Sequence, residues 1–274
     1  MRVGLIVDNR RLLRWHLLLA DHLRARLPDL ETRFFVESGS EPLPASARLL
    51  LTLERMILRG GRPTVCDPLS EAALGARSAP EFAPDVFIDC TGRERAPPPG
   101  AAPVLRPLFD GEPDEEAMMG ALLAGRAPVI GVEERRSGAI LASGLPSREA
   151  ADGLTGAIEA VVSRLFFLID AALGPQPANQ ISLRPQAANY RAGSALRFGA
   201  KNLARLCASR LYHLCCHAPH WRVGWRFVDG PGVLERGDLS GPRWNVLADS
   251  GQRFFADPFP IVWKGRAFVF FEDL

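Results

Sequence analysis

The segment 84–92 combines a strand pattern with polar side chains at its carboxyl end. Residues 84–90 are predicted to form a buried strand that Thr91 and Gly92 close. In open α/β sheets, ligands bind outside the carboxyl ends of the strands. Asp89, Thr91 and Gly92 are therefore candidate ligand-binding residues. Cys90 would need a nearby histidine to act as a nucleophile, and nothing in the sequence places one there.

A second candidate lies directly after the first predicted strand, where the chain reads Asp8, Asn9, Arg10 and Arg11. The backbone amides at the start of the following helix, together with the arginine side chains, favour an anion. Asn9 and Arg10 are therefore candidate ligand-binding residues. The alternative is an ordinary solvated loop, because neither the glycine-rich dinucleotide fingerprint nor a P-loop is present.

A third group gathers cysteines and histidines between residues 207 and 220. His213 and His217 are four residues apart and would share one face of a helix. Cys215 and Cys216 are adjacent, so they would point in different directions, and no Cys-x-x-Cys pair occurs. We therefore expect a helix that packs its thiols inward and carries imidazoles at its end, with no metal and no cofactor.

The first 173 residues alternate strand and helix patterns, which predicts an α/β fold. Such units form an open, mostly parallel sheet with helices on both faces. Ser137 and Gly138 predict a two-residue hairpin turn, and Asp152 is a candidate cap for a long helix that ends near residue 173. Strands are predicted at residues 3–7, 32–36, 84–90, 128–133 and 139–143, and helices at residues 12–27, 47–58 and 115–123.

The pattern changes twice in the rest of the chain. Residues 174–190 are rich in Pro, Gln, Asn and Ala, which predicts a linker, and residues 194–217 have helical periodicity. Short aromatic-rich strands then alternate with Gly and Pro turns, and these strands are predicted at 221–228, 244–247, 259–263 and 267–272. We therefore expect an α/β domain over residues 1–173, a linker and basic helix over 174–217, and an all-β segment over 218–274.

Composition limits the classes of function. The 274 residues carry a formal charge of +2, which is too balanced to indicate nucleic acid or an acidic membrane surface as the partner. No apolar run has the length of a transmembrane segment, and the N-terminus lacks the pattern of a secretory signal. The five cysteines have no disulfide-scaffold spacing, so we expect a reducing compartment and a cytoplasmic protein.

The most specific motif lies near the C-terminus. The sequence Ala-Asp-Pro-Phe occupies residues 256–259, and strands are predicted at 259–263 and 267–272, joined at Lys264 and Gly265. Proline at the first position of a strand costs no ladder hydrogen bond, and the residue before it, Asp257, is pushed toward extended geometry.

This stretch resembles the first blade of the five-bladed propeller of family 43 glycoside hydrolases. It is most similar to the propeller of the glucosamine inositolphosphorylceramide transferase family. The resemblance implies that Asp257 is a catalytic base on an innermost strand. Glycoside hydrolysis needs a second carboxylate across the bond, which would come from another blade. Propellers close with typically about 4–8 blades, so the resemblance implies a truncated propeller in which missing blades or a partner cover the apolar strands.

Residues 128–173 resemble the second half of formyltransferase-like domains. Arg136 stands where that family has its catalytic aspartate, and no histidine or asparagine lies between Cys90 and Glu116. The base and the electrophilic stabiliser of formyl transfer are therefore missing, and the α/β domain is expected to be degenerate.

Together the two resemblances imply a carbohydrate-related protein that modifies sugars or binds glycans, without a complete active site. Its expected ligand is a carbohydrate or a sugar nucleotide. Two alternatives stay open, namely a non-catalytic binding or scaffold module and an inactive fragment.

Overall fold

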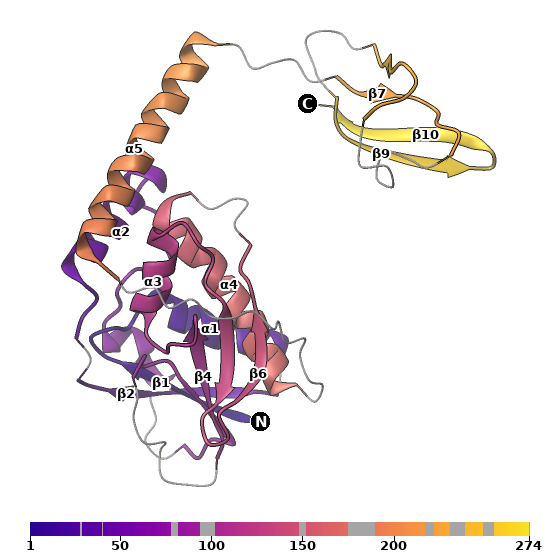
Figure 1. Cartoon of the computed structure of the whole chain (residues 1–274). Helices are drawn as coiled ribbons and strands as arrows, with labels where there is room; N and C mark the ends of the chain where they lie inside the picture. Colours follow the sequence, from indigo (N-terminus) through magenta and orange to yellow (C-terminus); the bar gives the residue numbers. More distant parts are fainter. Residues whose placement is uncertain are drawn as a thin grey trace. The chain divides into compact units, whose positions relative to one another are not determined.

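The computed structural model describes residues 1–27, 29–39, 41–77, 82–93, 102–147, 152–174, 190–216, 222–230, 239–248 and 255–273. The chain forms two compact units (Figure 1). Unit 1 spans Met1–Arg205 and unit 2 spans Leu206–Leu274.

Unit 1 is an α/β unit built on a six-stranded sheet of order β2-β1-β3-β4-β5-β6. Neighbouring strands from β2 to β4 are parallel, and β5 and β6 are added antiparallel. The mostly parallel sheet expected from the sequence is confirmed. The strands are β1 (Arg2–Asp8), β2 (Glu31–Glu37), β3 (Val86–Asp89), β4 (Val104–Phe109), β5 (Ile130–Glu134) and β6 (Ala139–Gly144).

Strand β4 was not predicted from the sequence, although all six of its residues are buried. Arg106 and Pro107 interrupt its apolar run and hide the strand pattern. The Arg106 guanidinium lies 2.7 Å from the Glu133 carboxylate on the neighbouring strand β5. A buried charge is tolerated where it is paired and hydrogen-bonded in this way.

The helices of unit 1 gather on one side of the sheet rather than on both sides. Helix α4 contacts α1, α2 and α3 and also packs on β5 and β6 (Figure 1). Buried side chains of all four helices share one apolar cluster with Leu5, while Ile6, on the opposite face of β1, lies outside it. The helices are α1 (Arg14–Arg26), α2 (Ala45–Leu58), α3 (Glu115–Leu123) and α4 (Gly153–Leu173), and a 3₁₀ helix, η1, spans Glu71–Arg77.

The hairpin of β5 and β6 is present, but its turn differs from the prediction. Four residues, 135–138, connect the strands instead of two. The Glu134 side chain shapes this turn by accepting hydrogen bonds from the backbone amides of Arg136 and Ser137 at 3.0 and 2.8 Å. The Ser137 hydroxyl also donates to this carboxylate at 2.6 Å, and this hydrogen bond, followed by those from the backbone amides, lowers the pKa of Glu134.

Helix α4 is capped by a residue from another helix. Asp152, the predicted cap, makes no side-chain hydrogen bond to the helix. Instead the buried Glu54 of α2 accepts from the backbone amides of Leu154 and Thr155 at 2.9 and 2.7 Å. Gly153 has a φ of +70°, and a Cβ on it would lie 2.6 Å from the Glu54 carboxylate. Glycine is therefore the residue that fits between this helix and its cap.

Helix α5 spans Ala192–Cys215, close to the predicted 194–217, and most of the preceding linker lies outside the described residues. Ala195 is buried in the apolar cluster of unit 1 and Phe198 packs against that cluster. The start of α5 therefore belongs to unit 1. None of the described helices combines the length and the apolar character needed to span a bilayer.

Unit 2 contains two small antiparallel sheets among its described residues. One pairs β7 (Gly224–Trp225) with β8 (Asn245–Val246), and the other pairs β9 (Phe255–Trp263) with β10 (Arg266–Asp273). These strands were predicted at similar positions.

Asp257 lies inside β9 rather than before it. The register shifts so that Asp257 and Pro258 together stand opposite one residue, Phe271, between the pairs Ala256–Glu272 and Phe259–Phe270. This is a β-bulge, and Asp257 has a φ of +47° in it. The expectation of extended geometry before proline is therefore wrong, because the bulge imposes a left-handed conformation that aspartate tolerates better than most residues.

Candidate functional site

The strand order identifies one place in unit 1 where a ligand site is expected. From the central strand β1 the chain moves first to β2 on one side and then to β3 on the other. The carboxyl ends of β1 and β3 therefore form the switch point at which ligands bind in open α/β sheets. The structure brings the predicted residues to this edge, since Asn9 and Arg10 follow β1 while Thr91 and Gly92 follow β3.

The side chains of Asp89 and Thr91 are buried at this edge of the sheet. They are 1% and 2% exposed, and one Asp89 carboxylate oxygen accepts from the Thr91 hydroxyl and amide at 2.7 and 3.1 Å. The other oxygen accepts from Arg135 at 3.1 Å. A buried carboxylate needs such partners. These contacts hold the loop after β3 to the β5–β6 turn.

Ion pairs connect the other loops that lie at the carboxyl ends of these strands. Arg93 pairs with the buried carboxylate of Asp8 at the end of β1. Arg11 lies 2.7 Å from Asp114 and 3.1 Å from Glu116, and its Nε donates to the Glu41 carbonyl at 2.6 Å.

Gly92 suits its position through its backbone conformation, because a Cβ there would make only ordinary van der Waals contacts. It has a φ of +71°, and a Cβ there would lie 3.5 Å from the Pro113 carbonyl oxygen. This left-handed conformation suits glycine.

A buried polar group that sequence reasoning missed lies behind this edge. The Trp15 indole donates to Glu115 at 3.1 Å, and the second Glu115 oxygen is buried without a hydrogen-bond partner in the described structure. Burial raises the pKa of Glu115 to about 7. The Trp15 ring stacks on His16, and burial lowers the pKa of His16 to about 4. The sequence signal was weak, because Glu115 reads as an ordinary acidic residue in the first turn of a helix.

Cys90 has His16 beside its backbone. Burial, followed by the charge of Asp89, raises the pKa of the Cys90 thiol well above its usual value. Because the thiolate is the nucleophilic form, this shift disfavours a nucleophilic role for Cys90.

Asn9 and Arg10 are the predicted residues that reach toward solvent. Asn9 is partly exposed, although its Oδ1 atom is buried and has no hydrogen-bond partner in the described part of the chain. The Arg10 amide donates to Asp8 at 2.9 Å, and its exposed side chain borders a pocket beside α2. Of the five residues proposed for unit 1, Arg10 lines this pocket and the other four do not.

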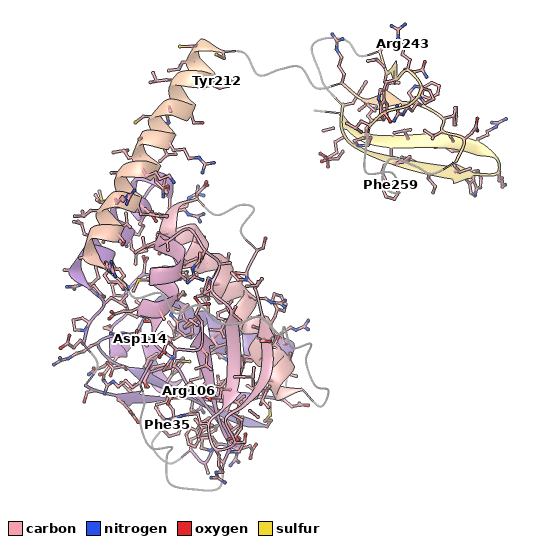
Figure 2. The ribbon with its side chains drawn as sticks, in the orientation of Figure 1. Phe35, Arg106, Asp114, Tyr212, Arg243 and Phe259 are labelled. Carbon is pink, nitrogen blue, oxygen red and sulfur yellow. The ribbon has the colours of Figure 1, made fainter. Side chains whose placement is uncertain are left out.

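A groove of about 810 Å³ lies between the two small sheets of unit 2. Its walls carry five aromatic side chains, four of them at least 41% exposed. Asp257 is exposed and precedes Pro258, which lines the groove, whereas Phe259 (labelled in Figure 2) is not among the lining residues. The aromatic lining consists of Trp225, Phe227, Trp244, Phe268 and Phe271.

The remaining candidates have simpler surroundings. Arg136 lies in the β5–β6 turn, where its backbone amide donates to Glu134. Cys207, Cys215 and Cys216 are exposed free thiols, contrary to the expected inward packing, and His217 and His220 lie outside the described residues. In the described ranges, no three His, Cys, Asp or Glu side chains are grouped so that they could hold a metal ion.

Comparison with known proteins adds no assignment. No protein-family model matches the chain, and no curated protein matches it either.

Proposed function

We propose that this chain is a carbohydrate-related protein that binds glycan through the aromatic groove of unit 2. The observation that carries the proposal is the concentration of exposed Trp and Phe rings in one concave surface next to the Ala-Asp-Pro-Phe segment. The sequence resemblance to the glucosamine inositolphosphorylceramide transferase family supports the same ligand class.

The groove has the chemistry of a small-molecule site. Such sites are concave and mostly apolar, with a few polar groups that orient the ligand. Arg226 is stacked 4.2 Å above the centre of the Trp244 ring and donates to the Pro242 and Ser240 carbonyls at 2.9 and 3.0 Å. This arrangement fixes Trp244 as a flat platform. The C–H face of a sugar ring can pack on such a ring while its hydroxyls stay in water.

Binding is the better proposal than hydrolysis. Hydrolysis of a glycosidic bond needs two carboxylates on opposite sides of that bond. Among the described side chains near Asp257, the other carboxylate is Glu272, and it belongs to the same hairpin because it pairs with Ala256. The proposed role of Asp257 is therefore to accept hydrogen bonds from ligand hydroxyls.

We further propose that residues 218–274 form one blade of a five-bladed propeller. The support is the large apolar area outside the groove that the two-stranded sheets leave exposed, including Phe259 at 67% and Phe270 at 62%. Isolated two-stranded sheets are marginally stable, so neighbouring blades would bury these side chains. In this proposal unit 1 is a degenerate relative of formyltransferase-like domains.

The test is a glycan array probed with the full chain and with two matched tryptophan variants. Trp225→Ala removes a groove residue, while Trp263→Ala removes an exposed tryptophan that does not line the groove. We expect glycan binding that falls about tenfold or more in the first variant, because a buried aromatic anchor is worth about 2 kcal/mol, and is unchanged in the second. Absence of glycan binding by the full chain, or equal losses in both variants, would overturn the proposal.

A further inference from the structure

A separate pocket of about 340 Å³ opens beside α2 in unit 1. We call it the arginine pocket, because four arginines line it together with an apolar floor. The lining residues are Arg10, Arg11, Leu13, Leu43, Arg48, Leu51, Thr52, Arg55, Thr64, Cys66, Asp67 and Pro68.

Helix geometry places one wall of the arginine pocket. Arg48, Thr52 and Arg55 are spaced i, i+4 and i+7, so they lie along one side of α2. Leu50 and Leu51 of the same helix are buried in the apolar cluster. The helix is therefore anchored while its arginines face the pocket.

Backbone hydrogen bonds fix the opposite wall. Two hydrogen bonds attach the loop 64–68 to the start of α1. The backbone amide of Arg14 donates to the Asp67 carbonyl at 2.9 Å, and that of Trp15 donates to the Val65 carbonyl at 3.0 Å. The hydroxyl of Thr64 also donates to the Asp67 carboxylate at 2.9 Å. The pocket is thus built by three segments that hold one another in place.

The charges of the arginine pocket do not balance. Arg11 is paired with Asp114 and Glu116, and Arg55 lies 3.4 Å from Asp67. In the part of the chain that the structure describes, the exposed side chains of Arg10 and Arg48 have no ion-pair or hydrogen-bond partner. The Nε of Arg55 is buried and also lacks a partner there. Two positive charges therefore remain uncompensated around one cavity.

We infer that the arginine pocket binds the phosphate monoester group of a small molecule. A phosphate monoester carries a charge of about −1.5 to −2 at pH 7, which matches the two unpaired arginines. Guanidinium groups bind phosphate oxygens with paired hydrogen bonds. The floor of Leu13, Leu43 and Leu51 suits the carbon part of the ligand. This inference concerns unit 1 alone and is independent of the proposed glycan groove.

The test is calorimetric titration of the full chain with inorganic phosphate, glycerol 3-phosphate and acetate at constant ionic strength. We expect both phosphate compounds to bind more tightly than acetate. Arg48→Gln should weaken phosphate binding about tenfold or more, because the charge-assisted hydrogen bonds of one guanidinium to the phosphate are lost. Arg62→Gln is the matched control, since Arg62 is exposed near α2 but does not line the pocket.

A second arm distinguishes the source of the phosphate. Vesicles of phosphatidylcholine mixed with phosphatidic acid are compared with soluble glycerol 3-phosphate. Binding to either one that is lost in Arg48→Gln supports the inference and identifies the source. Acetate binding as tight as phosphate binding, no phosphate binding, or equal affinity in wild type and Arg48→Gln would each overturn it. Thermal unfolding without ligand checks that the variants are folded.

Discussion

Glu115 and His16 are buried around the same tryptophan, and burial displaces their ionisation in opposite directions. Glu115 titrates at about 7 in the folded chain and near 4.5 when unfolded, so the folded state holds more protons between these values. Its contribution to stability is full below pH 4.5 and is lost as the pH rises to 7. His16 titrates at about 4 when folded and near 6.5 when unfolded, so its contribution increases with pH over that range.

Each of the two shifts corresponds to about 3 kcal/mol, because one pKa unit is worth about 1.36 kcal/mol. The two contributions change in opposite directions with pH, so together they leave the free energy of unfolding nearly independent of pH. We predict that the stability of Glu115→Gln relative to wild type increases by about 3 kcal/mol as the pH rises from 4.5 to 7.5. Urea unfolding at a series of pH values measures this difference.

The exposed Glu112 provides the control. Glu112→Gln should follow the wild-type curve across the same pH range. Parallel curves for wild type and Glu115→Gln would show that the pKa of Glu115 is the same in the folded and unfolded chain, contrary to the expected effect of its burial.

At the scale of the elements, the contact between α2 and α4 depends on one carboxylate. Glu54 accepts the first amides of α4, which have no partner within the helix. We predict that Glu54→Gln lowers the free energy of unfolding by about 2–3 kcal/mol, because charged acceptors of buried hydrogen bonds contribute about 1.5–3 kcal/mol. Urea unfolding measures the loss.

Asp152→Ala tests the alternative cap. Asp152 is exposed and makes no capping hydrogen bond, so its loss should cost less than about 0.5 kcal/mol. If Asp152→Ala is the more damaging variant, the cap of α4 is local after all.

The sequence predicted most elements, because apolar periodicity follows directly from the burial of one face. Helix α3 was predicted with its observed bounds, Glu115–Leu123. Strand β4 was missed because Arg106 is compensated by Glu133, which is distant in the sequence. The cap of α4 was misassigned for the same reason, since Glu54 precedes that helix by about a hundred residues.

The candidate site was predictable only in its location. The end-of-strand rule led to Asp89, and the anion-binding property of a helix N-terminus led to Asn9 and Arg10. The structure places all three at the same sheet edge. Which of them faces a pocket was not predictable, because the inward turn of Asp89 depends on Arg135. The contribution of α2 to the arginine pocket likewise depends on how separate elements pack.

At the scale of the whole molecule, the two units differ in how well they bury their apolar side chains. Unit 1 holds nearly all of the buried apolar residues. Among the described residues of unit 2, a single apolar residue, Val223, is buried. The fragment 1–216 retains unit 1 and all of α5. We predict that it unfolds cooperatively in urea at the same midpoint as unit 1 within the full chain.

Trp15 makes this measurement direct, because it is buried and is the single tryptophan among the first 216 residues. Its fluorescence in the fragment is compared with circular dichroism of the full chain. A fragment that is unfolded, or a midpoint that shifts strongly, would show that unit 2 is needed for the stability of unit 1.

The two prolines of β9 make the free edges of its sheet unequal. Pro258 and Pro260 have no amide hydrogen, so β9 lacks two backbone donors, whereas β10 from Arg266 to Asp273 has a donor at every residue. Proline on an edge strand discourages the addition of another strand. Any extended segment that adds to this sheet is therefore expected to join along β10.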